Sequence, residues 1–167
     1  AISWSPYLWE RYIEPAYRDR CLRFDINDTR TEIDMFIEGQ PVPPSMKLPT
    51  LQLFGLATGY GQKENEGRGL GELDTSPLFD GSMEDMDARL RFLDDEGFDM
   101  QLIFPTLGLM WEGLIEDPGL AAAHCRAYNR WALELTVGRR ERLCPLGHIS
   151  LRDPAAAVKE LEGLNAE

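Results

Sequence analysis

From residue 82 onward, the apolar residues follow helix-like and strand-like patterns in turn. Apolar residues three or four apart predict helices that begin near Ser82, at Asp117 and at Asp153. Ser82 with Asp85 resembles a capping box, and the first of these helices is expected to end at Gly97. Asp117 and Asp153 each precede a proline, and this order places an N-cap before a residue suited to the first helical position. Two short apolar runs, near 98–104 and 143–151, are typical of buried strands.

The order helix, strand, helix, strand, helix predicts parallel strands joined by helical crossovers. We therefore expect an α/β fold for residues 81–167. Two strands are too few for a parallel sheet, which is covered on both faces and needs several neighbours. The apolar positions expected to face the sheet are Met86, Leu90 and Leu93, then Leu120, Ala123, Ala127, Trp131 and Leu135, and finally Val158, Leu161 and Leu164.

Residues 1–80 lack this regularity and contain many prolines and glycines. One short helix is predicted, with Ser5 as its cap and Pro6 in its first turn. Thr31–Glu38 alternates in polarity, which predicts a strand or one arm of a hairpin. Residues 59–75 are expected to form a long loop. The inward-facing positions would be Leu8, Trp9, Tyr12 and Ile13 in the helix and Ile33, Met35 and Ile37 in the strand.

The charge of the chain limits its partners. The 167 residues include 17 Lys and Arg against 29 Asp and Glu, which gives a formal net charge of −12. We expect no nucleic-acid partner, because phosphate binding needs a surplus of basic residues. We also expect no membrane partner: the longest apolar run, Leu102–Trp111, contains Pro105 and Gly108 and is shorter than the roughly 20 residues of a membrane span.

The cysteines indicate a reducing compartment. Cys21, Cys125 and Cys144 are odd in number and widely spaced, without a Cys-x-x-Cys pair. This arrangement is typical neither of a disulfide framework nor of a thiolate zinc site, so a cytoplasmic location is expected. The first residues also lack the features of a signal peptide.

Four stretches carry a family resemblance through their order and spacing: Tyr7–Tyr12 with Tyr17–Arg20, Leu93–Gly108, Arg126–Trp131, and Leu146–Pro154 with Ala157, Val158 and Leu161. Together they resemble the amidohydrolase-related, metal-dependent family of (β/α)₈ barrels that includes aminocarboxymuconate-semialdehyde decarboxylase.

The resemblance implies the N-terminal part of a (β/α)₈ TIM barrel. Residues 1–80 would be a long irregular insertion after a first strand that ends just before Ala1. The runs at 98–104 and 143–151 would be the second and third strands, and strands four to eight would follow Glu167. A complete barrel typically needs about 250 residues, so we expect one incomplete domain.

The same resemblance implies one divalent metal ion, zinc, which activates water or polarises a substrate for loss of carbon dioxide. The family's ligand motifs lie on the first strand and on the fifth, sixth and last strands, and they are absent from this sequence. We therefore assign no metal ligand and no catalytic residue here. The implied activity is that of a metal-dependent hydrolase or decarboxylase acting on a small, carboxylate-bearing cyclic or aromatic compound.

Four residues are candidate substrate contacts, because active sites of such barrels lie at the carboxyl ends of the strands. Phe104 would line the pocket, and Thr106 would donate a hydrogen bond or else stabilise a turn. His148 would touch the substrate, or be a hydrogen-bonded histidine inside the barrel. Arg152 would bind a substrate carboxylate, or pair with a neighbouring helix. His124, in mid-helix, is expected to be a packed or a surface helix residue and not a ligand.

Other functions stay open. The chain could be a truncated or split barrel that has no activity and acts only as an assembly partner. A nucleotide-binding domain is disfavoured, because the glycines of Gly67–Gly71 lack both the Lys-Ser/Thr of a P-loop and a flanking strand and helix. Asp94–Glu96 would lie at the end of the barrel opposite the active site. A small-molecule substrate is the expected partner, and a homo-oligomer is a possible assembly.

Overall fold

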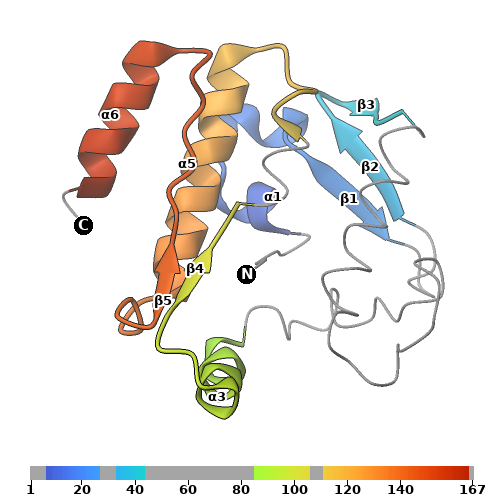
Figure 1. Cartoon of the computed structure of the whole chain (residues 1–167). Helices are drawn as coiled ribbons and strands as arrows, with labels where there is room; N and C mark the ends of the chain where they lie inside the picture. Colours follow the sequence, from blue (N-terminus) through green and yellow to red (C-terminus); the bar gives the residue numbers. More distant parts are fainter. Residues whose placement is uncertain (1–6, 27–32, 44–84, 106–110, 166–167) are drawn as a thin grey trace.

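The computed structural model describes residues 7–26, 33–43, 85–105 and 111–165 (Figure 1). In chain order the elements are the helix α1 (Leu8–Tyr12), the 3₁₀ helix η1 (Pro15–Arg20), the strands β1 (Arg23–Ile26), β2 (Ile33–Ile37) and β3 (Gln40–Pro41), the helix α3 (Met86–Glu96), the strand β4 (Gln101–Ile103), the helix α5 (Pro118–Leu135), the strand β5 (Leu143–Pro145) and the helix α6 (Pro154–Asn165). The predicted features at Ser5, Pro6, 59–75 and Thr106 lie outside the described residues.

Helix α5 runs through the middle of the molecule, with α1 on one side and α6 on the other (Figure 1). Its start is the predicted one: the Asp117 carboxylate accepts hydrogen bonds from the backbone N–H groups of Gly119 and Leu120, at 2.8 and 3.3 Å. The predicted apolar stripe is confirmed, since Leu120, Ala123, Ala127 and Trp131 are buried and Leu135 is partly buried.

The region before residue 44 is more regular than the sequence indicated. β1, β2 and β3 form an antiparallel sheet in that order, whereas only β2 and α1 were predicted. A two-residue turn at Glu38 and Gly39 joins β2 to β3, and both residues have positive φ, at 52° and 74°. This conformation matches the twist of a hairpin, and glycine adopts it without steric cost. The role of residues 1–80 as a barrel insertion stays a prediction.

β4 and β5 pair in parallel, as predicted, with Leu102 opposite Cys144. Both strands are shorter than the predicted 98–104 and 143–151. The last contact along the pair is the N–H of Leu146 donating to the carbonyl of Ile103 at 2.9 Å. Pro105 follows β4 and has no N–H to continue the ladder, so the regular pairing ends there.

The flanking helices have local signals at their ends. Helix α3 has Asp85 as its N-cap, whose carboxylate accepts from the N–H of Ala88 at 2.8 Å, so this helix begins later than the predicted start near Ser82. Gly97 ends this helix at φ 72°, as predicted. Helix α6 begins after Asp153, whose carboxylate accepts from the N–H groups of Ala155 and Ala156.

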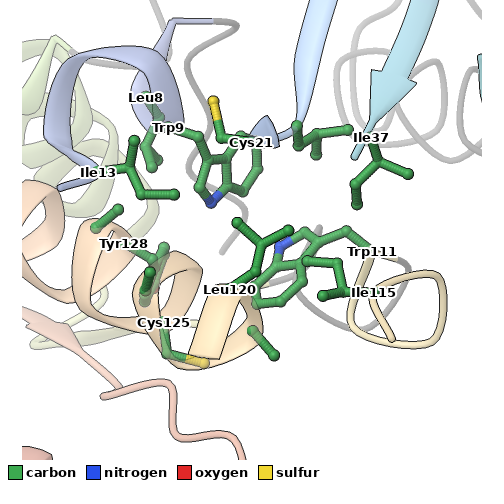
Figure 2. Close-up of a cluster of buried hydrophobic side chains, with 14 of the residues drawn as sticks. Leu8, Trp9, Ile13, Cys21, Ile37, Trp111, Ile115, Leu120, Cys125 and Tyr128 are labelled. Carbon is green, nitrogen blue, oxygen red and sulfur yellow. The ribbon is translucent and has the colours of Figure 1, made fainter. Parts of the chain in front are cut away.

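The apolar side chains form two clusters. The larger joins α1, β1, β2 and α5, and its two indoles, Trp9 and Trp111, lie edge to face with ring centroids 6.3 Å apart (Figure 2). The smaller lies between α3 and the strand pair. Its buried members are Met86, Leu93, Ile103 and Leu143.

Candidate functional site

The candidate site lies in the two loops that follow the parallel strands. Trp111 and Glu112 belong to the connection from β4 to α5, and His148 belongs to the connection from β5 to α6. Both loops extend from the carboxyl ends of their strands. His148 follows the end of β5 by three residues, so it lies on an extended loop and not on the predicted strand.

The side chain of His148 lies among aromatic rings and one carboxylate. Its Nε2 lies 3.4 Å from the carboxylate of Glu112, and its side chain is 11% exposed. The ring centroid of Trp111 is 5.1 Å away and that of Tyr128 is 6.1 Å away, the latter edge to face. Burial lowers the pKa of His148, although Glu112 acts in the opposite direction. The imidazole is therefore neutral near pH 7 and able to accept or donate a proton.

Glu112 also connects His148 to a second predicted residue, Arg152. The Arg152 guanidinium donates to the backbone carbonyl of Glu112 at 3.0 Å, across the two loops. Arg152 is exposed, and this contact joins it to a carbonyl of a loop. One of its two predicted roles had been a salt bridge to a neighbouring helix. The structure thus brings His148 and Arg152 together at Glu112, a residue the sequence had not singled out.

The remaining candidates have different surroundings. Phe104, just beyond β4, is 50% exposed. Thr106 lies outside the described residues. The substrate-contact roles of Phe104, Thr106, His148 and Arg152 stay predictions.

Of the two alternatives for His124, a packed or a surface helix residue, the structure shows the first, since His124 is fully buried. Its Nε2 accepts a hydrogen bond from the N–H of Leu22 at 2.9 Å, and its Nδ1 lies 2.8 Å from the carbonyl of Leu120. These two partners assign the proton to Nδ1. Burial lowers the pKa of His124 to about 4. The neutral ring therefore joins Leu22, just before β1, to α5, and it also lies against the indole of Trp111, with ring centroids 4.8 Å apart.

Asn129 is a second residue that the sequence had not singled out. It lies on α5 and is 3% exposed, and its amide binds the backbone of His148 at both polar atoms. A buried asparagine on a helix with an apolar stripe is a signal of such a role, because a buried amide requires partners. The partner itself, 19 residues further along the chain, has no local signature.

The described residues do not form a metal centre. Within ranges 7–26, 33–43, 85–105 and 111–165, no group of three or more His, Cys, Asp or Glu side chains lies close enough to hold a metal ion. The residues described here therefore do not fit the metal that the family resemblance implies, and no chemical step is assigned to it. That a divalent metal is bound by residues outside this chain stays a prediction.

Comparison with known proteins defines the class. The family model described as Amidohydrolase matches residues 68–167, and the chain belongs to this family. The amidohydrolase part of the expected resemblance is thereby confirmed, whereas its decarboxylase branch stays a prediction. A comparison with curated proteins gave no match.

One solved structure shows the fold. A crystal structure of an amidohydrolase from Mycobacterium avium subsp. paratuberculosis K-10 matches with a TM-score of 0.68 and 20% sequence identity. The match covers 99% of this chain and 45% of that chain, so the chain spans less than half of that protein's length. At this identity the likeness concerns the fold alone. In the part of the chain that the structure describes, no helix is long and apolar enough to cross a membrane.

Proposed function

We propose that the chain is the N-terminal portion of a (β/α)₈ barrel enzyme, a metal-dependent hydrolase or decarboxylase. Its substrate would be a small carboxylate-bearing cyclic or aromatic compound. Family membership over residues 68–167 and the fold shared with part of an amidohydrolase support this proposal. The observation that carries it is the contact between His148 and Glu112, because it lies beyond the carboxyl ends of parallel strands, where barrel enzymes bind substrates.

The exposed face of the strand pair supports the barrel part of the proposal. Ile103 on β4 is buried against α3, whereas its neighbours Leu102 and Phe104 are 45% and 50% exposed. Alternate residues of a strand face opposite sides of the sheet. The exposed side therefore corresponds to the interior of a barrel, which further strands would cover. Val158 and Leu161 of α6 are also exposed, at 57% and 48%.

The side chains around Glu112 suit the proposed substrate class. The neutral imidazole of His148 would take up or release a proton, with the Glu112 carboxylate beside Nε2 to stabilise the protonated form. The exposed guanidinium of Arg152 would donate to a substrate carboxylate. Phe104 would offer an aromatic surface to a ring. Zinc as the metal rests on the family resemblance, and a cytoplasmic location rests on the three free cysteines.

The test uses the protein with its complete barrel and a panel of aromatic and cyclic carboxylates, with hydrolysis and carbon dioxide release measured separately. His148→Ala is expected to lower turnover by about 100-fold, a typical effect of losing a proton-transfer group, without unfolding the protein. Phe92→Ala is a matched control, because Phe92 is 51% exposed on α3. Unchanged kinetics in His148→Ala would make this histidine structural and remove the main support for the proposal.

A second function is favoured by one observation. The exposed apolar residues of β4 and α6 would also suit a non-catalytic fragment that acts only as an assembly partner. Co-purification of the 19.0 kDa chain with a second polypeptide, without turnover of any compound in the panel, would favour this alternative. Turnover by a single longer polypeptide would exclude it.

A further inference from the structure

The extended segment after β5 is held by the side chain of Asn129 in place of a neighbouring strand. The Asn129 Nδ2 donates to the carbonyl of His148 at 2.9 Å, and its Oδ1 accepts from the N–H of His148 at 2.7 Å. One amide thus satisfies both backbone groups of one residue, as a paired strand would. The hydrogen bonds between β4 and this segment end at Leu146. At His148, two residues further on, the side chain of Asn129 takes the place of a neighbouring strand.

A second residue fixes the Asn129 amide itself. Its Nδ2 also donates to the carboxylate of Glu160 on α6, at 2.8 Å. An amide nitrogen has two N–H groups, and here one binds His148 and the other binds Glu160. The amide therefore has only one orientation that satisfies its three contacts. Helices α5 and α6 together determine where the backbone of His148 lies.

This placement sets the surroundings of the His148 imidazole. The ring faces Glu112 from the loop after β4 and Tyr128 from α5. The buried His124, also on α5, is close enough to interact electrostatically with it. Two further charged residues contact the neighbours of His148: Glu160 on α6 accepts from the Asn129 amide, and Arg152 donates to the backbone carbonyl of Glu112. A shift of the His148 backbone would change the 3.4 Å separation of Nε2 from the Glu112 carboxylate.

We propose that Asn129, anchored by Glu160, is a positioning residue that fixes the His148 imidazole against Glu112. The idea that the fixed histidine serves turnover rests on the proposed function. The positioning itself does not, because it follows from the three hydrogen bonds of one buried amide. The family match covers this region as a whole and assigns no role to Asn129 or Glu160.

The first arm of the test is spectroscopic and needs no substrate. Histidine-labelled protein is titrated by NMR, and the His148 signal is assigned from its absence in His148→Gln. Asn129→Ala is expected to move the His148 pKa upward, toward the ordinary value of about 6.5, because burial, which lowers this pKa, has a larger effect than the contact with Glu112, which raises it, and both are weakened when the ring is released. Glu160→Ala, which keeps Asn129, is expected to give a smaller shift in the same direction and serves if Asn129→Ala does not fold.

Two control variants separate positioning from general damage to α6. Glu160→Gln keeps an acceptor for the Asn129 amide and is expected to restore the wild-type His148 signal. Glu162→Ala removes an exposed acid of the same helix that makes no contact with Asn129 in the described structure, and it is expected to change nothing. A wild-type His148 pKa in both Asn129→Ala and Glu160→Ala would overturn the positioning role.

The second arm measures turnover in the complete protein. Asn129→Ala is expected to lower kcat by about 10-fold and to leave KM within about twofold, because misplacement of a reacting group affects the chemical step most. In a His148→Gln background, the same change is expected to have an effect below about twofold. Full additivity of the two changes would overturn action through His148. A wild-type protein without turnover would contradict the proposed function, and the NMR arm would still decide the positioning.

Discussion

The two halves of the molecule differ in how completely their apolar side chains are covered. The hairpin half (α1, η1 and β1–β3) closes over one side of α5, and its large side chains Leu8, Trp9 and Leu22 are at most 2% exposed. The barrel half (α3, β4, β5 and α6) buries one face of its strand pair and leaves Met100, Leu102 and Phe104 about half exposed.

This difference in exposure shows which apolar surfaces are covered by the described residues of this chain. Helix α5 and the hairpin half share a core whose buried aromatic and aliphatic members are at most 7% exposed (Figure 2). The two parallel strands are fewer than such a sheet needs. Sequence changes in the hairpin half should therefore affect stability directly, whereas changes on the exposed face of β4 should matter only when further strands are present.

The largest expected effect tests the closed side. Trp131→Ala removes an indole that is 2% exposed on α5 and packs near Tyr128, with ring centroids 5.9 Å apart. We expect a loss of about 3–5 kcal/mol in the free energy of unfolding, typical of an aromatic residue removed from a core. Urea unfolding measures it, with the exposed Phe92→Ala as the control. A loss below about 1 kcal/mol would show that this side of α5 is not closed.

The next effect concerns the pH dependence of stability. It depends on the junction formed by His124 of α5 and Leu22, the residue just before β1. Because His124 has a pKa of about 4 in the fold and about 6.5 in the unfolded chain, the unfolded chain binds more protons between these values. The contribution of neutral His124 to the free energy of unfolding is therefore complete above pH 6.5, and it falls as the pH decreases toward 4. The difference between the pKa values of His124 in the folded and the unfolded chain corresponds to about 3 kcal/mol in the free energy of unfolding.

Urea unfolding at pH 7 and pH 4.5 measures this dependence. His124→Gln is expected to be less stable than wild type at pH 7 and to lose less stability on acidification. His148→Gln is the matched comparison, since burial lowers the pKa of His148 as well. If His124→Gln kept the whole pH dependence of the wild type, the junction would not be the source.

The smallest expected effect lies on the open side. Phe104→Ala in the chain as described is expected to cost less than about 1 kcal/mol, because half of this side chain is already exposed. In the complete barrel the same change should cost about 3 kcal/mol or more, if further strands cover it. Equal small losses in both proteins would remove the distinction between the two halves.

Local signals in the sequence predicted the helices well. Asp117 with Pro118, Asp153 with Pro154, and Gly97 each form the expected cap, because capping depends on residues next to each other in the chain. β1 was missed because Arg23–Ile26 is short and half charged, and only its pairing with β2 makes it a strand. β5 was predicted too long because its end depends on Pro105, far away in the sequence.

The candidate site was predictable in part and for a similar reason. The position of His148 after a strand indicated the carboxyl end of a sheet, and the structure places it in the loop there. Glu112 and Asn129 were not predicted, because each meets His148 through folding across 36 and 19 residues. No local sequence pattern predicts a contact between two loops, or between the side-chain amide of a helix residue and a backbone segment far away in the sequence.

The claim that this chain is part of an amidohydrolase barrel is tested most directly by the intact mass and the metal content of one purified sample of the native protein. We expect a polypeptide about twice the 19.0 kDa of this chain, in line with the 45% coverage of the matching amidohydrolase, and about one divalent metal ion per polypeptide. A native polypeptide of 19.0 kDa without a stoichiometric metal ion would contradict the claim.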